Sequence, residues 1–83
     1  MTRDEVLSLI RAHLADELNI DGGGIDEGTH LRDDLEADSL DLYSLVQELE
    51  DSYGIRMPDD EAAKIVTVGQ AVDYVVANVP ERA

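Results

Sequence analysis

The stretch LEADSLDLYSLVQELEDSYG, residues 35–54, carries the clearest folding signal in this chain of 83 residues. Its apolar side chains recur at the spacing of one helical face. They are Leu42, Leu45, Val46, Leu49 and Tyr53. The pattern predicts an amphipathic helix that begins at Asp38 or Ser39. Gly54 is expected to end it, because glycine readily adopts the left-handed conformation found after helix C-termini.

A first helix and a long loop are predicted ahead of this stretch. Thr2 and Glu5 have the spacing of a capping box, and a helical pattern of apolar residues follows over residues 3–18. Three consecutive glycines, 22–24, should stop any continuation, since glycine is costly inside a helix. Residues 19–37 are therefore predicted to form a loop that apolar side chains hold against the bundle. These side chains are Ile25, Leu31 and Leu35.

Two shorter helices are predicted after the stretch. Pro58 suits the first turn of a helix over about residues 59–65, whose acidic start favours the positive end of the helix dipole. Thr67 and Gln70 repeat the capping-box spacing ahead of a last helix, and Pro80 sits at its end. The buried face of that helix is predicted to be Val68, Ala71, Val72, Val75 and Val79.

The whole pattern is typical of an all-α protein, because strand alternation is missing throughout the chain. We predict a small four-helix bundle with a short third helix and a long loop between its first two helices. A length of 83 residues suffices for one small domain, so residues 1–83 are expected to form a single domain.

The charge of the chain restricts its partners. Twenty acidic residues against six basic ones give a formal net charge of -14, which disfavours nucleic acid and anionic membrane surfaces. Residues 33–61 alone hold eleven acids and one base, Arg56. Such clustering favours a basic protein partner that is attracted over a long range.

The chain has no cysteine, which excludes disulfides and thiolate metal sites and is compatible with a reducing compartment. The sequence also lacks a signal-peptide pattern and an apolar run long enough to span a membrane. We therefore expect a cytoplasmic protein that begins at its own Met1, and we expect a monomer.

Ser39 is the one serine predicted to lie at a helix start, whereas Ser8, Ser44 and Ser52 fall inside helices. A serine at that place is most often a helix cap. Asp38 can cap equally well, and Ser39 would then be free for another role. No GxSxG motif is present and nothing positions His13 or His30 as a base, so both histidines are interpreted as surface residues without a role. Ser39 is more plausible as a site that another enzyme modifies than as a nucleophile, and no catalytic residue is predicted.

The face of the central helix opposite its apolar stripe is predicted to be a docking surface. Leu40 and Tyr43 would be exposed there, ringed by polar and acidic groups beside Ser39. The surface is predicted to comprise Asp38, Leu40, Asp41, Tyr43, Ser44, Gln47, Glu48 and Asp51. Exposed ion pairs contribute only about 0–1 kcal/mol each, so docking through this surface should be fast and weak.

The motif DSL at residues 38–40 and the segment PDDEAAKI at residues 58–65 closely resemble those of the acyl carrier proteins, and the resemblance spans nearly the whole chain. It implies that a phosphopantetheinyl transferase attaches 4'-phosphopantetheine from coenzyme A to Ser39. The thiol of that arm would carry acyl groups as thioesters. The arm would thus supply the thiol that the chain lacks, since it has no cysteine. The transferase, a ketosynthase and other acyl-processing enzymes with basic patches would bind to the predicted docking surface.

The residues themselves suggest a second role, which concerns the acyl chain. Several aliphatic side chains are predicted to face one another between the second, third and fourth helices, where an acyl chain could enter. They are Leu42, Val46, Leu49, Met57, Ala62 and Ile65. Each buried methylene is worth about 0.8 kcal/mol, so a medium chain would gain a few kcal/mol. The same residues serve as ordinary core in any four-helix bundle.

Four positions depart from the common pattern of the family. Glu36 stands where a glycine is usual, and Tyr43, Ser44 and Gln47 differ on the predicted docking surface. They leave the carrier function intact and make the choice of partners open. Fatty-acid biosynthesis is the default pathway, and a dedicated polyketide pathway is an alternative.

Three other functions compete with this hypothesis. The acidic, glycine-rich segment at residues 17–28 suggests an EF-hand, but Gly28 occupies the position that requires a bidentate glutamate, so no metal site is predicted. An acidic adaptor that is never modified would use Ser39 only as a cap. A carrier of aminoacyl groups, peptidyl or D-alanyl, would share the arm and be loaded by a different enzyme.

Overall fold

The computed structural model describes residues 2–79, and its first helix, α1, spans Arg3–Leu18. The predicted capping box is present: the Glu5 amide donates to Thr2 Oγ1 at 3.2 Å, and the Thr2 amide donates to Glu5 Oε1 at 2.8 Å. The predicted range of this helix, residues 3–18, is confirmed, and the glycines at 22–24 lie beyond its end. The helix ends at Asn19, which takes a left-handed conformation (φ 57°) that asparagine tolerates well. Gly22–Gly24 instead forms a short 3₁₀ turn, η1, whose Gly23 amide donates to Asp21 Oδ1.

The central helix, α2, spans Ser39–Tyr53, as the sequence predicts. Gly54 ends it with a left-handed conformation (φ 65°), and its amide donates to the Glu50 carbonyl at 2.9 Å. Leu45 and Leu49 are buried, whereas Leu42, Val46 and Tyr53 are half-buried against the core. The predicted apolar stripe therefore faces inward.

The third helix, α3, spans only Asp59–Ala62 and is shorter than predicted. Past it, the Lys64 amide donates to the Glu61 carbonyl and the Ile65 amide donates to the Ala62 carbonyl. These bonds run three residues back, so the segment tightens into turns instead of continuing as an α-helix. Pro58 is the N-cap residue of α3 and lies just before its first turn.

The last helix, α4, spans Val68–Asn78 and begins with the predicted Thr67–Gln70 capping box. Its predicted buried face is confirmed, with the last member, Val79, half-buried and just past the helix end. Pro80 lies outside the described residues. None of the described helices combines the length and the apolar character that crossing a membrane would require.

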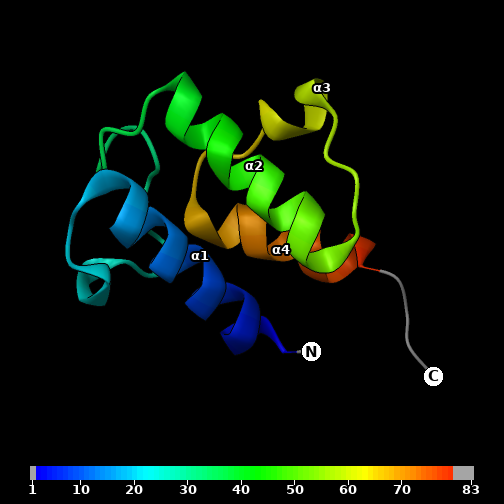
Figure 1. Cartoon of the computed structure of the whole chain (residues 1–83), viewed down its shortest axis with the longest axis horizontal. Coiled ribbons are helices and arrows are strands. Elements are labelled where there is room, and N and C mark those ends of the chain that lie inside the picture. The colour runs from blue at the N-terminus through cyan, green and yellow to red at the C-terminus, as the bar shows by residue number, and fades with distance from the viewer. Residues whose placement is uncertain (1, 80–83) are drawn as a thin grey trace.

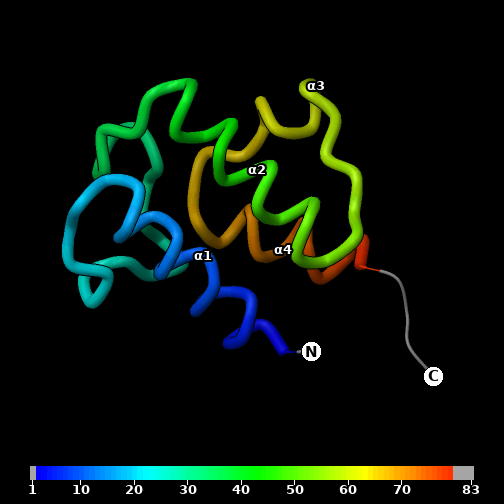
Figure 2. Tube along the Cα trace, viewed as in Figure 1, coloured from blue at the N-terminus to red at the C-terminus, as the bar shows by residue number. Residues whose placement is uncertain are grey.

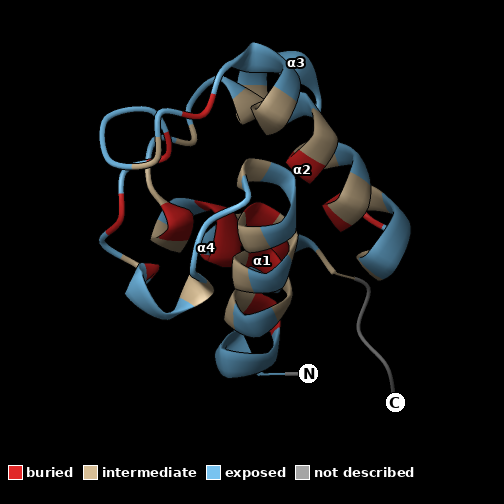
Figure 3. Ribbon diagram, turned by 60° about the vertical axis from the view of Figure 1, so that its left-hand side comes forward, coloured by how far each residue is buried: buried red, intermediate tan, exposed pale blue. Residues whose placement is uncertain are grey.

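The helix α1 packs against both α4 and α2, and the short α3 lies near α2 (Figure 1). Buried residues gather on the inward sides of these helices (Figure 3). The core consists almost wholly of aliphatic side chains. Its largest fully buried members are Ile10, Leu14, Ile25, Leu31, Leu49, Val6, Val68, Val72 and Val75. The all-α fold with a short third helix is confirmed for the part of the chain that the structure describes.

The long loop between α1 and α2 is fixed to the start of α4, an interaction that the sequence did not predict (Figure 2). His30 and Thr67 form an isolated antiparallel bridge, in which the Leu31 amide donates to the Val66 carbonyl at 2.9 Å and the Val68 amide donates to the Thr29 carbonyl at 3.0 Å. Ile25 and Leu31 are buried and Leu35 is half-buried, as predicted for the three anchoring side chains. The loop is thereby held in place where it enters α2.

Close backbone contact explains the glycine at the start of α4. The Gly69 amide donates to the Glu27 carbonyl at 2.8 Å. A Cβ on residue 69 would lie 2.8 Å from that same carbonyl oxygen, which is too close for any side chain. Gly69 therefore permits the loop to dock on α4.

Candidate functional site

The start of α2 leaves the hydroxyl of Ser39 free of any capping role. The Asp41 amide donates to Asp38 Oδ1 at 2.9 Å, and the Asp38 amide donates to Asp41 Oδ2 at 3.2 Å. Asp38 is thus the N-cap and Ser39 is the first helical residue, with an exposed side chain. Of the two possibilities that the sequence left open, the structure selects the one in which Ser39 is not the cap.

Neither histidine lies beside Ser39 as a base. His30 pairs with Asp34, its Nδ1 lying 3.5 Å from Asp34 Oδ2, and His13 Nε2 lies 3.3 Å from Ser44 Oγ. Within residues 2–79, the side chain that comes within hydrogen-bond distance of Ser39 Oγ is that of Arg32, whose Nη2 lies at 3.5 Å. Among the described residues the hydroxyl therefore has a cation beside it and no proton acceptor that would activate it.

Arg32 is a site residue that sequence reasoning missed. It lies seven positions before Ser39, in the turn segment 31–35, and is brought to the helix start by the reversal of the chain at Glu36 and Ala37. The reversal depends on two hydrogen bonds, from the Glu36 amide to the Arg32 carbonyl at 3.0 Å and from the Ala37 amide to the Leu31 carbonyl at 3.0 Å. Sequence spacing alone gives no sign of this turn.

The predicted docking surface is exposed over most of its length. The exposed fractions of Leu40 and Tyr43 are 78% and 58%, and Gln47 and Asp51 are exposed as well. Asp38 is exposed, and Asp41 is half-buried where it completes the capping box. Glu48 is half-buried and accepts a hydrogen bond from Ser52 Oγ at 2.6 Å. The apolar pair beside Ser39 is therefore accessible, with carboxylates around it.

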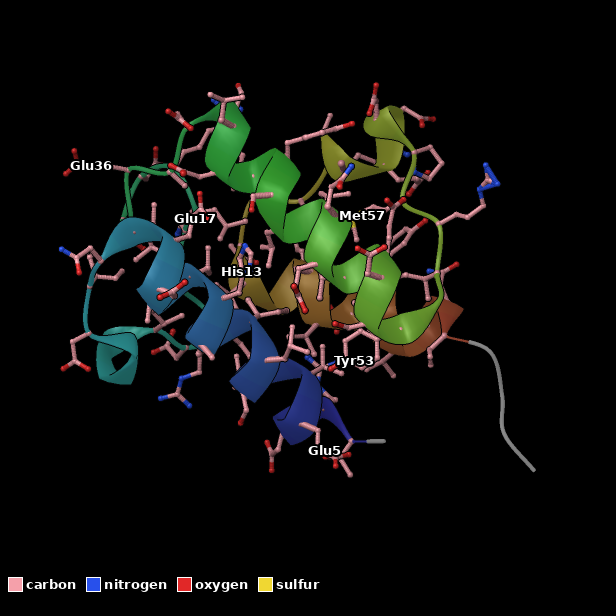
Figure 4. All side chains as sticks on the ribbon, in the orientation of Figure 1. Glu5, His13, Glu17, Glu36, Tyr53 and Met57 are labelled. Carbon is pink, nitrogen blue, oxygen red and sulfur yellow. The ribbon has the colours of Figure 1, made fainter. Side chains whose placement is uncertain are left out.

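The predicted position of Ser44 on that exposed face was wrong. Ser44 is half-buried and turned toward α1, where its Oγ lies 3.3 Å from His13 Nε2 and donates to Glu17 Oε1 at 3.4 Å. Figure 4 shows His13 and Glu17 on the side of α1 that faces α2. His13 consequently links two helices, which corrects the expectation that it has no role. Its place three residues after the buried Ile10 is the sequence signal that could have indicated this.

A cavity of about 380 Å³ opens beside Ser39, between α2 and α3. All six residues predicted to surround an acyl chain line it, and Met57 is seen between these elements in Figure 4. Its full lining is Leu31, Arg32, Ser39, Leu42, Tyr43, Leu45, Val46, Leu49, Met57, Asp59, Ala62, Ala63, Ile65 and Ala71. The lining is mainly aliphatic, with polar groups at Arg32, Ser39 and Asp59, so the cavity suits an apolar chain attached at one polar end.

Two tyrosines away from Ser39, Tyr53 and Tyr74, have raised pKa values, first because they are partly buried and second because carboxylates lie near them. Burial raises the pKa of Tyr53, and the negative charges of Glu5 and Glu48 raise that pKa further. Burial also raises the pKa of Tyr74, whose hydroxyl donates to the Arg56 carbonyl at 2.7 Å. Within residues 2–79, no cluster of His, Cys, Asp or Glu side chains is arranged to hold a metal ion.

Comparison with known proteins gives matches that extend over most of the chain. Residues 8–75 match the family described as "Phosphopantetheine attachment site". The chain is 50% identical over 76 residues to the acyl carrier protein of Rubrobacter xylanophilus, covering 92% of this chain and 94% of that one. It is 44% identical over 75 residues to the acyl carrier protein of Lactobacillus acidophilus, covering 90% and 94% of the two chains.

Solved structures agree with the sequence relatives. The acyl carrier protein from Enterococcus faecalis superposes with a TM-score of 0.80 at 41% identity, covering 94% of this chain and 99% of that one. The acyl carrier protein from Thermotoga maritima also gives a TM-score of 0.80, at 27% identity, covering 93% of this chain and 89% of that one. Both superpositions extend over nearly all of the described fold.

Proposed function

Because the chain belongs to the acyl carrier protein family, we propose that it holds growing acyl chains as thioesters on a 4'-phosphopantetheine arm at Ser39 and delivers them to enzymes of fatty-acid biosynthesis. The observation that carries this proposal is the Ser39 hydroxyl, which Asp38 releases from capping and which lines an apolar cavity. In its cytoplasmic setting the protein would act as a carrier and would leave the chemistry to its partners.

The residues present fit such an arm. When bound, the arm supplies a terminal thiol, which this chain of 83 residues lacks because it has no cysteine. Ser39 is exposed, so a transferase can reach its hydroxyl, and Ser39 lies in the first turn of α2, at the positive end of the helix dipole, which favours an anion. Residues 1–83 would form one carrier domain around this single attachment point.

The exposed side of α2 supports the proposal that partners dock next to the arm. Leu40 and Tyr43 offer apolar contact, and Asp38, Gln47 and Asp51 surround them with polar and negative groups. A phosphopantetheinyl transferase, a ketosynthase and other enzymes with basic patches match this surface in charge. Because its ion pairs are exposed, each partner would bind weakly and leave quickly, as serial delivery requires.

The aliphatic cavity supports a second role, shielding of the acyl chain. Its lining residues Leu42, Val46 and Ile65 are half-buried and Leu49 and Met57 are buried, so an entering chain would exchange water for apolar contacts. At about 0.8 kcal/mol for each buried methylene, a medium chain would gain a few kcal/mol before ordering costs. Unfolding free energies that do not change with the length of the loaded acyl chain would contradict this role.

Intact-mass measurement tests the attachment. The purified chain is incubated with coenzyme A and a broad-specificity phosphopantetheinyl transferase, and we expect a gain of one phosphopantetheinyl group. Ser39→Ala should abolish the gain, and Ser52→Ala, which removes an exposed serine near the other end of α2, should leave it intact. No gain in the unchanged protein would support an unmodified adaptor instead.

The identity of the cargo separates the remaining alternatives. An acyl thioester of ordinary fatty-acid type on the protein from its native cells agrees with the proposal. A polyketide intermediate, or an aminoacyl, peptidyl or D-alanyl group, would indicate that the protein serves a dedicated pathway. The role of Ser39 as the attachment site would be the same. The similarity to relatives named acyl carrier protein supports the acyl cargo.

A further inference from the structure

The cation beside the attachment site has no evident structural role. Arg32 is exposed, and in the part of the chain that the structure describes its side chain makes one polar contact, at 3.5 Å between Nη2 and Ser39 Oγ. That contact is at the limit of a hydrogen bond and links two exposed groups, so it stabilises the fold little. Both residues also line the apolar cavity. The guanidinium of Arg32 is therefore a candidate to bind a ligand at this site.

The other cations among the described residues are committed elsewhere or distant. Arg3 bonds Glu27 and Asp73, and Arg11 donates to the Gly22 carbonyl at 3.3 Å. Lys64 pairs with Glu61 at 3.5 Å. Arg56 follows the C-terminal end of α2, and the fifteen residues of that helix, at about 1.5 Å each, separate it from the start.

The start of α2 would otherwise repel an anion. The side chains of Asp38 and Asp41 accept hydrogen bonds from the backbone on either side of Ser39, so two acidic groups lie close to its hydroxyl. A phosphodiester on Ser39 would add another negative charge to a chain whose net charge is already -14. The backbone amides of the first turn offset only part of that repulsion.

We propose that Arg32 binds the phosphate of the arm once the arm is attached to Ser39, and so fixes the direction in which the arm leaves the helix beside the cavity. The phosphate oxygens lie one bond beyond the phosphorus on Oγ, within reach of an Nη2 that is already 3.5 Å from Oγ. The planar guanidinium can bond two phosphate oxygens at once, which a lysine ammonium cannot reproduce. This inference rests on the proposed function, because it requires the arm at Ser39.

The test compares the effect of loading in matched variants. Apo and holo forms are prepared of the unchanged protein, Arg32→Gln, Arg32→Lys and Arg56→Gln, and intact mass verifies complete loading. Arg32→Gln and Arg56→Gln make the same change in net charge, so their comparison isolates the position of the charge. The melting temperature of each form is measured at low salt and again at about 0.5 M NaCl, where exposed charges are screened.

Loading should lower the melting temperature of Arg32→Gln by about 2–5 °C more than it lowers that of the unchanged protein, as expected for one exposed charge pair in a domain of this size. Arg56→Gln should respond to loading like the unchanged protein, and Arg32→Lys should fall between. High salt should reduce the difference. An equal effect of loading in all four proteins would overturn the inference.

A second readout needs no variant of Arg32. In the ¹⁵N-labelled protein, loading should shift the Nε–Hε resonance of Arg32 and slow its exchange with water, and should leave Arg56 unchanged. Absence of any Arg32 response in a fully loaded sample overturns the role of Arg32 alone. Failure of the protein to gain the phosphopantetheinyl mass overturns the proposed function, and with it this inference.

Discussion

Replacing Glu36 by glycine should stabilise the protein. Glu36 is exposed and has a left-handed backbone (φ 56°), which glutamate adopts at a cost and glycine adopts freely. Its side chain points away from the bundle (Figure 4), and within residues 2–79 it makes no hydrogen bond. The backbone bonds of the turn, from the Glu36 amide and the Ala37 amide, do not depend on the side chain.

The magnitude follows from three contributions. Relief of the left-handed conformation is worth roughly 1–2 kcal/mol. The greater freedom of glycine in the unfolded chain lowers the free energy of unfolding by about 0.5–1 kcal/mol. Removal of one exposed negative charge from a chain of net charge -14 adds a few tenths of a kcal/mol. The sum is a stabilisation of about 0.5–1.5 kcal/mol, which corresponds to roughly 3–8 °C in melting temperature for a domain of this length.

Urea unfolding of the apo protein, followed by circular dichroism, measures this difference. Glu36→Gln is the matched control, because it removes the charge and retains the Cβ. Its free energy of unfolding should rise only by the few tenths of a kcal/mol that come from removing the charge. Glu36→Asn should fall between them, since asparagine tolerates the left-handed region. If Glu36→Gln gains as much as Glu36→Gly, or if Glu36→Gly gains nothing, backbone strain at this turn is not the cause.

Three further predictions concern packing, salt and pH. Gly69→Ala should lower the unfolding free energy by about 1–3 kcal/mol in the same urea assay, because its Cβ would lie 2.8 Å from the Glu27 carbonyl. Gly24→Ala has open space around its Cβ and should cost far less; equal losses would refute the contact argument. Raising NaCl from about 0.02 to 0.5 M should raise the melting temperature by several degrees in calorimetry, because the net charge of -14 is then screened; a constant value would contradict this. The raised pKa of Tyr53 means that the fold favours its neutral form, so stability that is complete below about pH 10 should be lost as pH rises above it, and less so in Tyr53→Phe. A pH titration of unfolding in which Tyr53→Phe and the unchanged protein lose stability equally would show that Tyr53 makes no such contribution.

Features that depend on neighbouring residues could be predicted from the sequence. The capping boxes at Thr2 and Thr67, the stop at Gly54 and the inward stripe of α2 involve partners a few positions apart, where spacing alone determines the geometry. The cavity residues followed from the same stripe and from Met57, Ala62 and Ile65 on the segment that packs opposite it. The lining of the cavity could therefore be predicted from residue spacing, whereas the role of Ser39 rests on the resemblance to the family.

Features that depend on distant partners could not be predicted. Ser44 bonds His13 across 31 positions, and the docking of Gly69 on Glu27 joins a loop to a helix 42 positions away. The proximity of Arg32 to Ser39 depends on the left-handed backbone of Glu36. Glutamate rarely adopts that conformation, so the residue type does not predict it. Each of these contacts is set by how the helices pack, and residue spacing in the sequence does not specify it.

The central claim is that one hydroxyl, on Ser39, carries the cargo. The most direct measurement is peptide mapping by tandem mass spectrometry of the chain isolated from its native cells. The account predicts a phosphopantetheinyl thioester on the peptide that contains Ser39, with an acyl group at its end. A chain that is unmodified throughout, or that carries the group on another residue, would contradict the account.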